Sequence, residues 1–355
     1  MSDLKPVKLY DICILEKGQQ IDTSLLDDSK PYRYINGGIK ESGYYDDFNT
    51  SGESVLISEG GASCGYINYV NENFWCGCHC YRLHDIKVFP KYLFHALKAN
   101  QQRIMALRTG SAMPNIQKST IQKFELKIHD DINTQKKVSS MLDKCNELIE
   151  KHKLTLEKYD SLIKSRFIEM FGSENDFSKW NCCFVEDVAD VTVGVVIKPT
   201  QYYCEKGIPA FRSLNIGEMK VNDSDWVYFT EEGNERNRKS ILKENDVLVV
   251  RSGAPGKSCV ITKKYEGYNV VDAIIAHPNL EKVNPVFLCM FTNMPHGMNQ
   301  IKAKTGGAAQ QHFNVGGYNS LKIILPPLSL QNDFAAFVQQ IDKSKFEYKS
   351  TGVAA

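Results

Sequence analysis

The sequence predicts an α+β protein: two similar α/β globular domains joined by a long helix, with a shorter C-terminal helix packing antiparallel to it. Two observations carry this prediction. One uninterrupted helical pattern occupies the middle of the chain, and the residues on its two sides form two versions of one pattern. At 355 residues the chain is long enough for two domains with cores of their own. We place the domains at 1–132 and 173–328, the long helix at 133–172, and the C-terminal helix and tail at 329–355.

The central helix is predicted from an apolar seam. Alternating steps of four and three residues from Val138 meet mostly apolar or aromatic side chains, the 3.5-residue period of a helix that packs along another helix. Asn133 or Thr134 can cap its start, and Gly172 suits the position after its last turn. Such a helix is about 57 Å long, so we expect it to need a partner and to separate the domains on its two sides. An ordinary amphipathic core helix is the less favoured alternative because it would be shorter.

The chain also repeats itself. Several residues recur in the same order, the later ones at one constant offset that continues into both helical patterns. A repeat of this length indicates a duplicated domain and not a solenoid. The matching residues are Asp11 and Asp187, Gly18 and Gly194, Thr109-Gly110 and Thr305-Gly306, and Gln135 and Gln331.

Alternation of apolar residues and the position of glycine and proline predict the other elements. In the first domain we expect strands at 54–57, 66–70 and 124–128, and one helix over 92–105. In the second domain we expect strands at 247–250, 259–261 and 323–325, and a helix over 285–294. Ser329 caps a last helix that stops at Gly352. It is about 30 Å long, little more than half the length of the first.

The composition is that of a soluble globular protein. There is no run of eighteen apolar residues and no apolar signal core at the N-terminus, so we expect no membrane segment. Most of the 11 cysteines lie singly in apolar runs. We interpret them as reduced, which indicates a cytoplasmic protein.

The net charge is +1, but the charges are unevenly distributed. Residues 86–124 and 282–332 contain no aspartate or glutamate. Two separate basic stretches predict two positive patches that attract a polyanion. Their cations are Lys87, Lys91, Lys98, Arg103, Arg108, Lys118 and Lys123 in the first stretch, and Lys282, Lys302, Lys304 and Lys322 in the second.

Three motifs have catalytic or metal-binding analogues, and each has a plainer interpretation. Lys257 follows Gly253-Ala-Pro-Gly256, but Arg251 stands where a phosphate-binding loop needs its first glycine, so we predict a hairpin turn. Lys127 ends a Glu-Leu-Lys tripeptide that matches the end of a metal-dependent nuclease motif, but the acidic residue which that motif needs shortly before it is missing. Cys76, Cys78 and Cys80 could ligate zinc, but their spacing is not that of paired zinc ligands. We expect them on one face of a strand as core thiols.

The order of domain, long helix, domain and helix resembles the specificity (S) subunit of type I restriction-modification systems. The first residues that carry the resemblance are Arg108-Thr-Gly-Ser to Asn115-Ile116, then Gln135 and the seam to Phe171-Gly172. The second set is Lys304-Thr-Gly-Gly to Phe313-Asn314, Leu325-Pro326-Pro327-Leu328 and Gln331. The shorter second helix departs from the family pattern, in which the two helices pair fully.

The resemblance implies that each globular copy is a target recognition domain that binds one half of a split DNA site, and that the helices form a spacer. The chain would then be a non-catalytic subunit. Its expected partners are double-stranded DNA, two DNA adenine methyltransferase (M) subunits and restriction-translocase (R) subunits. S-adenosylmethionine, ATP and Mg are expected on those partners and none on this chain. Glu59-Gly-Gly-Ala aligns with Arg251-Ser-Gly-Ala in the repeat, so equivalent positions of the two domains carry different side chains. We therefore expect a bipartite, non-palindromic site.

Candidate site residues lie in the glycine-containing turns, the basic stretches and the end of the long helix. Arginine can bind guanine with two hydrogen bonds, so Arg108 and Arg251 are our candidates for base recognition. The full DNA-binding set is Arg108, Ser111, Asn115, Arg251, Ser252, Lys257, Lys302 and Lys304. The subunit-interface set, which we expect to be left uncovered by the short last helix, is Leu156, Tyr159, Ile163, Phe167 and Met170.

Two other functions stay open at this point. The chain could be a coiled-coil adaptor that binds only proteins, or a nuclease or NTPase that uses Lys127 or Lys257. An adaptor would show no steep salt dependence toward DNA. An enzyme would show turnover by the isolated chain that is lost on replacing these lysines.

Overall fold

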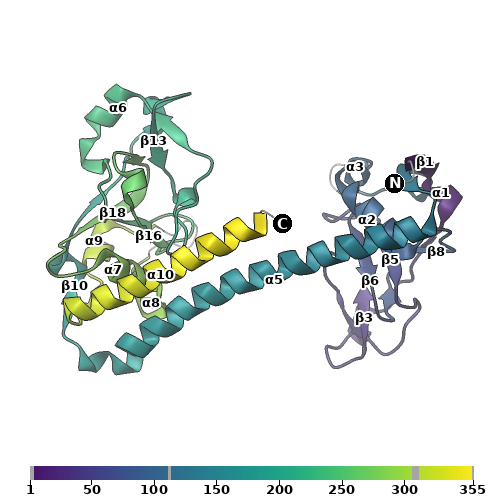
Figure 1. Cartoon of the computed structure of the whole chain (residues 1–355), viewed down its shortest axis with the longest axis horizontal. Coiled ribbons are helices and arrows are strands. Elements are labelled where there is room, and N and C mark those ends of the chain that lie inside the picture. Colours follow the sequence, from purple (N-terminus) through teal and green to yellow (C-terminus); the bar gives the residue numbers. More distant parts are fainter. Residues whose placement is uncertain (1–3, 111–112, 306–311, 354–355) are drawn as a thin grey trace. The chain divides into compact units, whose positions relative to one another are not determined.

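The computed structural model of the chain describes residues 4–110, 113–305 and 312–353 (Figure 1). It consists of two compact units, residues 1–151 and 152–355. The boundary between them lies inside α5 (Ile132–Phe171), the long helix that the sequence predicts. This helix contributes its first half to unit 1 and its second half to unit 2, and each unit has a core of its own.

Unit 1 is built on a central antiparallel sheet with a core on each face. Its strands are β1 (Leu4–Lys8), β2 (Ile14–Lys17), β3 (Tyr32–Ile35), β4 (Gly43–Tyr45), β5 (Ser54–Ser58), β6 (Ile67–Val70), β7 (Trp75–Cys76), β8 (Cys80–His84) and β9 (Glu125–His129). Its short helices are α1 (Leu9–Ile12), α2 (Pro90–Ala99), α3 (Gln101–Met105) and α4 (Lys118–Gln122). The central sheet has the order β2-β8-β5-β6, a smaller sheet has the order β4-β3-β7, and β1 pairs with β9. Val55 and Ile57 of β5 share a core with Leu93 of α2, whereas Leu56 belongs to a separate cluster with Ile35 of β3.

The single helix that we predicted over 92–105 is wrong at Asn100. This residue leaves helical geometry, with φ −102° and ψ 11°, and separates α2 from α3. Its side-chain amide donates to the carbonyl oxygen of Ala96 at 2.9 Å, the local bonding by which asparagine competes with a helix. The break lets Ile104 of α3 lie fully buried in the core.

Unit 2 repeats this architecture, which confirms the predicted duplication. Its strands are β10 (Cys182–Phe184), β11 (Ala189–Val193), β12 (Tyr203–Cys204), β13 (Ile208–Phe211), β14 (Val227–Phe229), β15 (Val247–Val250), β16 (Ser258–Val260), β17 (Asn269–Val270), β18 (Ala273–Pro278) and β19 (Lys322–Ile324). Its helices besides α5 are α6 (Glu231–Arg236), α7 (Pro285–Asn293), α8 (Pro295–Lys304), α9 (Val315–Asn319) and α10 (Leu328–Val353). The sheet β11-β18-β15-β16 corresponds to β2-β8-β5-β6, and the parallel pair β13–β17 corresponds to β3–β7.

The C-terminal helix α10 packs antiparallel to the second half of α5, as predicted, and runs beside it in Figure 1. Near its start, the ring of Phe334 lies 5.4 Å from that of Phe167 and 5.8 Å from that of Phe171. Near its end, Tyr348 stacks on His152 at 4.3 Å. The helix is 26 residues long and ends at Val353, one residue beyond the predicted end at Gly352. The predicted length of about 20 residues was therefore too short.

This packing corrects our prediction for the subunit interface. Ile163 and Phe167 are 4% and 1% exposed and belong to the core of unit 2, so they present nothing to a partner. Tyr159 and Met170 are half-buried against the same core. Leu156 is also half-buried and lines a hollow that includes Val338 of α10. Because α10 packs on the end of α5 that we expected to be free, Ile163 and Phe167 cannot form a docking face, whereas the prediction for Leu156, Tyr159 and Met170 stays a prediction.

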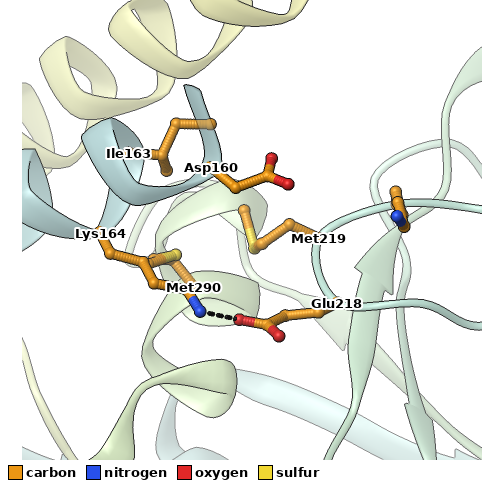
Figure 2. Close-up of a pocket in the computed structure, with 7 residues that line it drawn as sticks. Asp160, Ile163, Lys164, Glu218, Met219 and Met290 are labelled. Carbon is orange, nitrogen blue, oxygen red and sulfur yellow. Dashed lines mark ion pairs between the residues drawn. The ribbon is translucent and has the colours of Figure 1, made fainter. Parts of the chain in front are cut away.

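Polar contacts add to this packing. Lys164 of α5 forms a 2.5 Å ion pair with Glu218, in the loop that follows β13 (Figure 2). Figure 2 also shows Met219 of that loop facing Ile163 and Met290 of α7, around a small hollow that these residues line. The second half of α5 is therefore fixed to unit 2 by apolar and charged contacts together.

Gln135 and Gln331 occupy equivalent positions in the repeat and have the same role. Each bonds the start of a helix to backbone groups of its own unit. In unit 1 the carbonyl oxygen of the Gln135 side chain accepts from the Phe89 backbone N–H at 2.8 Å, and its amide donates to the His129 carbonyl at 2.7 Å. In unit 2 Gln331 accepts from the Asn284 N–H at 2.8 Å and donates to the Pro326 carbonyl at 2.8 Å. Both side chains are buried, so both pairs of backbone groups depend on them.

We expect Gln331→Ala to lower the free energy of unfolding of unit 2 by about 3 kcal/mol, because it leaves a buried N–H and a buried carbonyl unpaired. The measurement is urea denaturation followed by tryptophan fluorescence, since Trp180 and Trp226 lie in unit 2. Gln339→Ala, an exposed change on α10, is the matched control and should stay within about 0.5 kcal/mol of the unsubstituted chain. Equal effects of the two changes would contradict the bridging role of Gln331.

Candidate nucleic-acid interface

The two units share a backbone arrangement at the end of their central strand. After β5, Gly60 forms a β-bridge with Asn115, and the Ile116 N–H donates to the Glu59 carbonyl at 2.9 Å. After β15, Ser252 forms a β-bridge with His312, and the Phe313 N–H donates to the Arg251 carbonyl at 2.9 Å. Each turn is thus held by a segment that arrives from much later in its unit. The equivalent pairs are Glu59 and Arg251, Gly60 and Ser252, Asn115 and His312, and Ile116 and Phe313.

A repeated glycine lies beside each of these turns. The Gly18 N–H donates to the Cys80 carbonyl at 3.0 Å, and the Gly194 N–H donates to the Ala273 carbonyl at 2.9 Å. A Cβ atom at Gly18 would lie 2.3 Å from the Gly77 carbonyl oxygen, and one at Gly194 would lie 2.5 Å from that of Val270. Two backbone segments approach so closely that only glycine fits, which accounts for this match in the sequence repeat.

The side chains on this shared backbone differ between the units. In unit 1 the carboxylate of Glu59 accepts from Lys17 Nζ at 2.7 Å and from the Tyr81 hydroxyl at 3.1 Å, and His79 lies 3.8 Å away. Burial, together with the Glu59 carboxylate, raises the pKa of Tyr81 to about 12, so this hydroxyl stays a donor at neutral pH. An acid therefore stands at the centre of the unit 1 site.

In unit 2 the central residue of the turn has the opposite charge. Arg251 takes the place of Glu59, and Asp272, which directly precedes β18 as His79 precedes β8, takes the place of the histidine. Arg251 Nη1 lies 3.3 Å from Asp272 Oδ1, and its side chain is 18% exposed. The hydroxyl of Ser252 lies 3.0 Å from Asp272 Oδ2 and 3.0 Å from His312 Nδ1. A base paired with an acid, and a serine that bridges to a histidine, thus replace the acidic centre of unit 1.

Each arrangement borders an open hollow of polar and apolar lining. The unit 1 hollow has a volume of about 550 Å³ and is lined around Lys17, Glu59, Gly61, His79 and Asn115. The unit 2 hollow has a volume of about 600 Å³ and is lined around Lys220, Asn222, Ser252, Gly253 and Lys257. Both hollows combine a glycine turn with hydrogen-bonding side chains.

The candidate DNA-binding residues lie in unit 1, at the turn of unit 2 and on α8. Arg108 is exposed, and Asn115 is exposed beside the unit 1 hollow, where its Oδ1 lies 3.3 Å from Thr109 Oγ1. Ser111 lies outside the described residues. In unit 2, Arg251 is held in its ion pair, whereas Ser252 and Lys257 line the hollow.

The remaining two candidates, Lys302 and Lys304, are exposed on α8, where Lys304 Nζ donates to Ser320 Oγ at 2.8 Å. The structure therefore brings Ser252 and Lys257 together, and it places the two α8 lysines outside the lining of that hollow.

Sequence reasoning missed four side chains that the structure places at these turns: Lys17, His79, Asp272 and His312. Of these, His79 lies between Cys78 and Cys80 in the cysteine cluster. The signal for the others was weak, because each is a different residue type from its equivalent in the other unit. Only the neighbouring glycines and apolar residues repeat.

Our prediction for the cysteine cluster is wrong in one respect and confirmed in another. Cys76 ends β7, Cys80 begins β8, and Cys78 lies in the turn between them, so the three do not share one strand face. Cys76 and Cys80 are buried core thiols, as expected, and a hydrogen bond with Cys80 and burial raise the pKa of Cys76. Among the described residues there is no group of three or more His, Cys, Asp or Glu side chains that could hold a metal ion.

The two lysines with catalytic analogues have structural surroundings of their own. Lys257 leads directly into β16, so the turn before it precedes a strand and not the helix that a phosphate-binding loop requires. Lys127 is exposed on β9, opposite Pro6 of β1. No helix in the described part of the chain is long and apolar enough to cross a membrane.

Two copies of one fold, each with a hollowed turn and each with different charges on it, define a tandem-domain protein with two related but unequal sites. The family of type I restriction modification DNA specificity domains matches residues 1–158 and 178–352, nearly the whole chain and both units. The chain therefore belongs to this family.

Individual relatives agree with this assignment. A protein of Mycoplasma genitalium named as a type I specificity subunit is 29% identical over 187 residues, which are 51% of this chain and 49% of that protein. One of Mycoplasma pneumoniae is 28% identical over 194 residues, 51% of this chain and 50% of that protein. The chain thus spans about half the length of the curated relatives that it matches.

Solved structures share the fold at low sequence identity. The crystal structure of a type I restriction-modification system S subunit from M. genitalium matches with a TM-score of 0.66 and 19% identity, covering 99% of this chain and 93% of that one. A structure from work on complex assembly and conformational transition of the type I system matches with a TM-score of 0.54 and 14% identity, covering 99% and 94%. The duplicated domains and the two helices of this chain are thus found in S subunits.

Proposed function

We propose that this chain is a sequence-specific DNA-binding specificity subunit that directs type I methylation and cleavage to a bipartite, non-palindromic site. The observation that carries the proposal is the shared turn whose central residue changes charge: Glu59, near His79, in one unit and Arg251, paired with Asp272, in the other. Identical side chains would suit two identical half-sites. Side chains of opposite charge and different hydrogen-bonding capacity suit two different ones, since base edges are distinguished by their donors and acceptors.

DNA fits this surface better than a neutral ligand does. Exposed cations lie at or near the turns, with Arg108 in unit 1 and Lys257 in unit 2, and Lys302 is exposed on α8. Lysine and arginine at such positions neutralise phosphates and place the protein on the duplex, whereas side chains inside the turns are suited to base edges. We assign Lys257, Lys302 and Lys304 to phosphate contact, and Asn115 and Ser252 to the hydrogen-bonding surface.

The chemistry of methylation and cleavage is assigned to other chains. We propose two DNA adenine methyltransferase subunits and restriction-translocase subunits as partners, with S-adenosylmethionine, ATP and Mg bound by those subunits. The long helix α5 is proposed as the spacer that sets the gap between half-sites. Because Ile163 and Phe167 are buried, the methyltransferase contact is reassigned to residues 141–149 of α5, where four large apolar side chains are 40–56% exposed. They are Met141, Leu142, Leu148 and Ile149.

The proposed function is tested by expressing the full chain with its methyltransferase subunit in cells that lack adenine methylation, followed by methylome sequencing. We expect methylated adenines in one motif made of two short, different sequences separated by a fixed gap. The same cells carrying the methyltransferase subunit alone are the control and should show no such motif. A palindromic motif would contradict the assignment of different half-sites. Assembly of the complex without any methylated motif would favour the adaptor that binds only proteins.

A further inference from the structure

We propose that His312 is a specificity-determining residue of unit 2, and that its Nε2 atom accepts a hydrogen bond from the exocyclic amine of an adenine or a cytosine. The inference rests on the proposed function and deepens it, because it assigns one side chain to one kind of base edge. It comes from the juxtaposition of Asp272, Ser252 and His312, in which one hydroxyl bridges a carboxylate and an imidazole.

The backbone position of His312 is held by hydrogen bonds to the turn after β15. Its neighbour Phe313 is fully buried, and the Phe313 N–H donates to the Arg251 carbonyl at 2.9 Å. The bridge to Ser252 pins His312 itself at the end of β15. The imidazole is nevertheless exposed. An exposed side chain on a backbone held by hydrogen bonds suits a base-reading residue, because less freedom is lost on binding.

The hydrogen bonds then fix which ring nitrogen carries the proton. An ionised carboxylate only accepts, and a serine hydroxyl has one proton to donate. At 3.0 Å from Asp272 Oδ2, Ser252 Oγ donates that proton to the carboxylate, since otherwise two acceptors would face each other. At 3.0 Å from His312 Nδ1, the same oxygen must accept, so Nδ1 carries hydrogen. In the neutral form of the imidazole the lone pair therefore lies on Nε2.

The carboxylate of Asp272, which accepts from Ser252, is itself held by an ion pair. Asp272 lies 3.3 Å from Arg251 Nη1 through its other oxygen, so one oxygen faces the guanidinium and the other the serine. Its backbone has φ +49°, a left-handed conformation that aspartate tolerates better than most residues. The relay thus runs from Arg251 through Asp272 and Ser252 to His312. Because the Arg251 side chain is 18% exposed and paired with Asp272, we assign the base-reading role to the exposed histidine instead.

An acceptor at Nε2 selects among bases by elementary chemistry. In the major groove, adenine N6 and cytosine N4 are donors, whereas guanine O6 and thymine O4 are acceptors. The equivalent residue in unit 1 is Asn115, whose amide carries both donor and acceptor. The two units thus offer different hydrogen-bonding groups at one shared backbone position, in keeping with two different half-sites.

The test uses the full complex of this chain with its partner subunits and 30-base-pair duplexes that contain the methylome-defined site. At each unmethylated adenine or cytosine of the unit 2 half-site, the base is replaced by purine or 2-pyrimidinone, which lack the exocyclic amine. We expect one such position at which the replacement weakens binding of the unsubstituted complex by about 10-fold, and at which His312→Ala binds both duplexes equally weakly. Discrimination in the unit 1 half-site should be unchanged, which also reports that the variant is folded.

Ser252 is a positioning residue in this scheme, so its variants supply the second readout. Ser252→Ala should lose most of the discrimination at the same base position, and Ser252→Thr, which keeps the hydroxyl, should restore it. Lys257→Ala, a phosphate contact, should weaken binding to all duplexes alike and is the matched control. If His312→Ala weakens binding of the native and the amine-free duplex by the same factor, so that the discrimination between them remains, the proposal is overturned. If the unsubstituted complex has no sequence preference, the proposed function itself fails.

Discussion

Exchange of residues 1–132 for the corresponding segment of another family member is expected to change one half of the DNA site completely and to leave the other half unaltered. The unit 1 hollow with Lys17, Glu59 and Asn115 lies wholly within this segment. The unit 2 hollow lies wholly within residues 213–257. No side chain is shared between the two linings, so the exchange replaces one set of contacts only. Methylome sequencing of cells that carry the chimera measures the outcome.

The junction at residue 132 suits this exchange, because Gln135 bonds only to backbone atoms of the replaced segment, at Phe89 and His129. Any incoming segment of the same fold supplies them. The exception is Asp143 of α5, which bonds to the side chains of Lys91 and His95, each at 2.9 Å. These bonds lower the pKa of Asp143 although its burial alone would raise it. The incoming segment should therefore carry Lys and His at these two positions.

The reciprocal exchange of residues 173–328 is the matched control, and it should change only the other half-site. A chimera that alters both halves would contradict the assignment of one half-site to each unit. A chimera that methylates nothing, while its complex still assembles, would show that the exchanged segment does not read DNA independently.

The fold could be predicted from the sequence wherever a local pattern or the repeat carried the information. The seam from Val138 predicted α5, and the matched glutamines and glycines predicted the duplication, since Gln135 and Gln331 perform the same backbone bridging and Gly18 and Gly194 meet the same close approach. The break at Asn100 escaped because its apolar neighbours continue the helical period on both sides. Short strands such as β7 and β17, of two residues each, have too few residues for alternation to show.

The sites were less predictable because they depend on contacts between distant segments. Ser252 meets His312, and Arg251 meets Asp272, only after β15 and β18 have paired and the later segment has returned to the turn. The interface prediction is contradicted at Ile163 and Phe167 for a related reason. The seam around Ile163 is apolar because it is covered by the protein's own C-terminal helix and core, and a sequence pattern does not say which partner covers an apolar face.

Apolar side chains of α5 that the protein does not itself cover are the candidates for a partner contact, and changing them should have a large effect. Leu148→Glu combined with Ile149→Glu is expected to weaken assembly with the methyltransferase subunit by at least about 100-fold. These side chains are 56% and 51% exposed, and with Met141 and Leu142 they recur at intervals that place them on one face of α5. A partner that covers this face would have to bury two unpaired carboxylates, which costs several kcal/mol. Sedimentation velocity of the mixed subunits measures the loss.

The control must separate docking from folding, and the exposed positions allow this. Leu280→Glu changes an apolar side chain of unit 2 that is 54% exposed and lies outside α5, so assembly should be unaffected. A carboxylate at Ile163, by contrast, would be buried in the core of unit 2, and any loss of assembly there would report unfolding. The double variant should keep the thermal unfolding of the unsubstituted chain because its side chains point to solvent. Normal assembly of that folded variant would refute docking on this face and would place the methyltransferase contact on another surface of the chain.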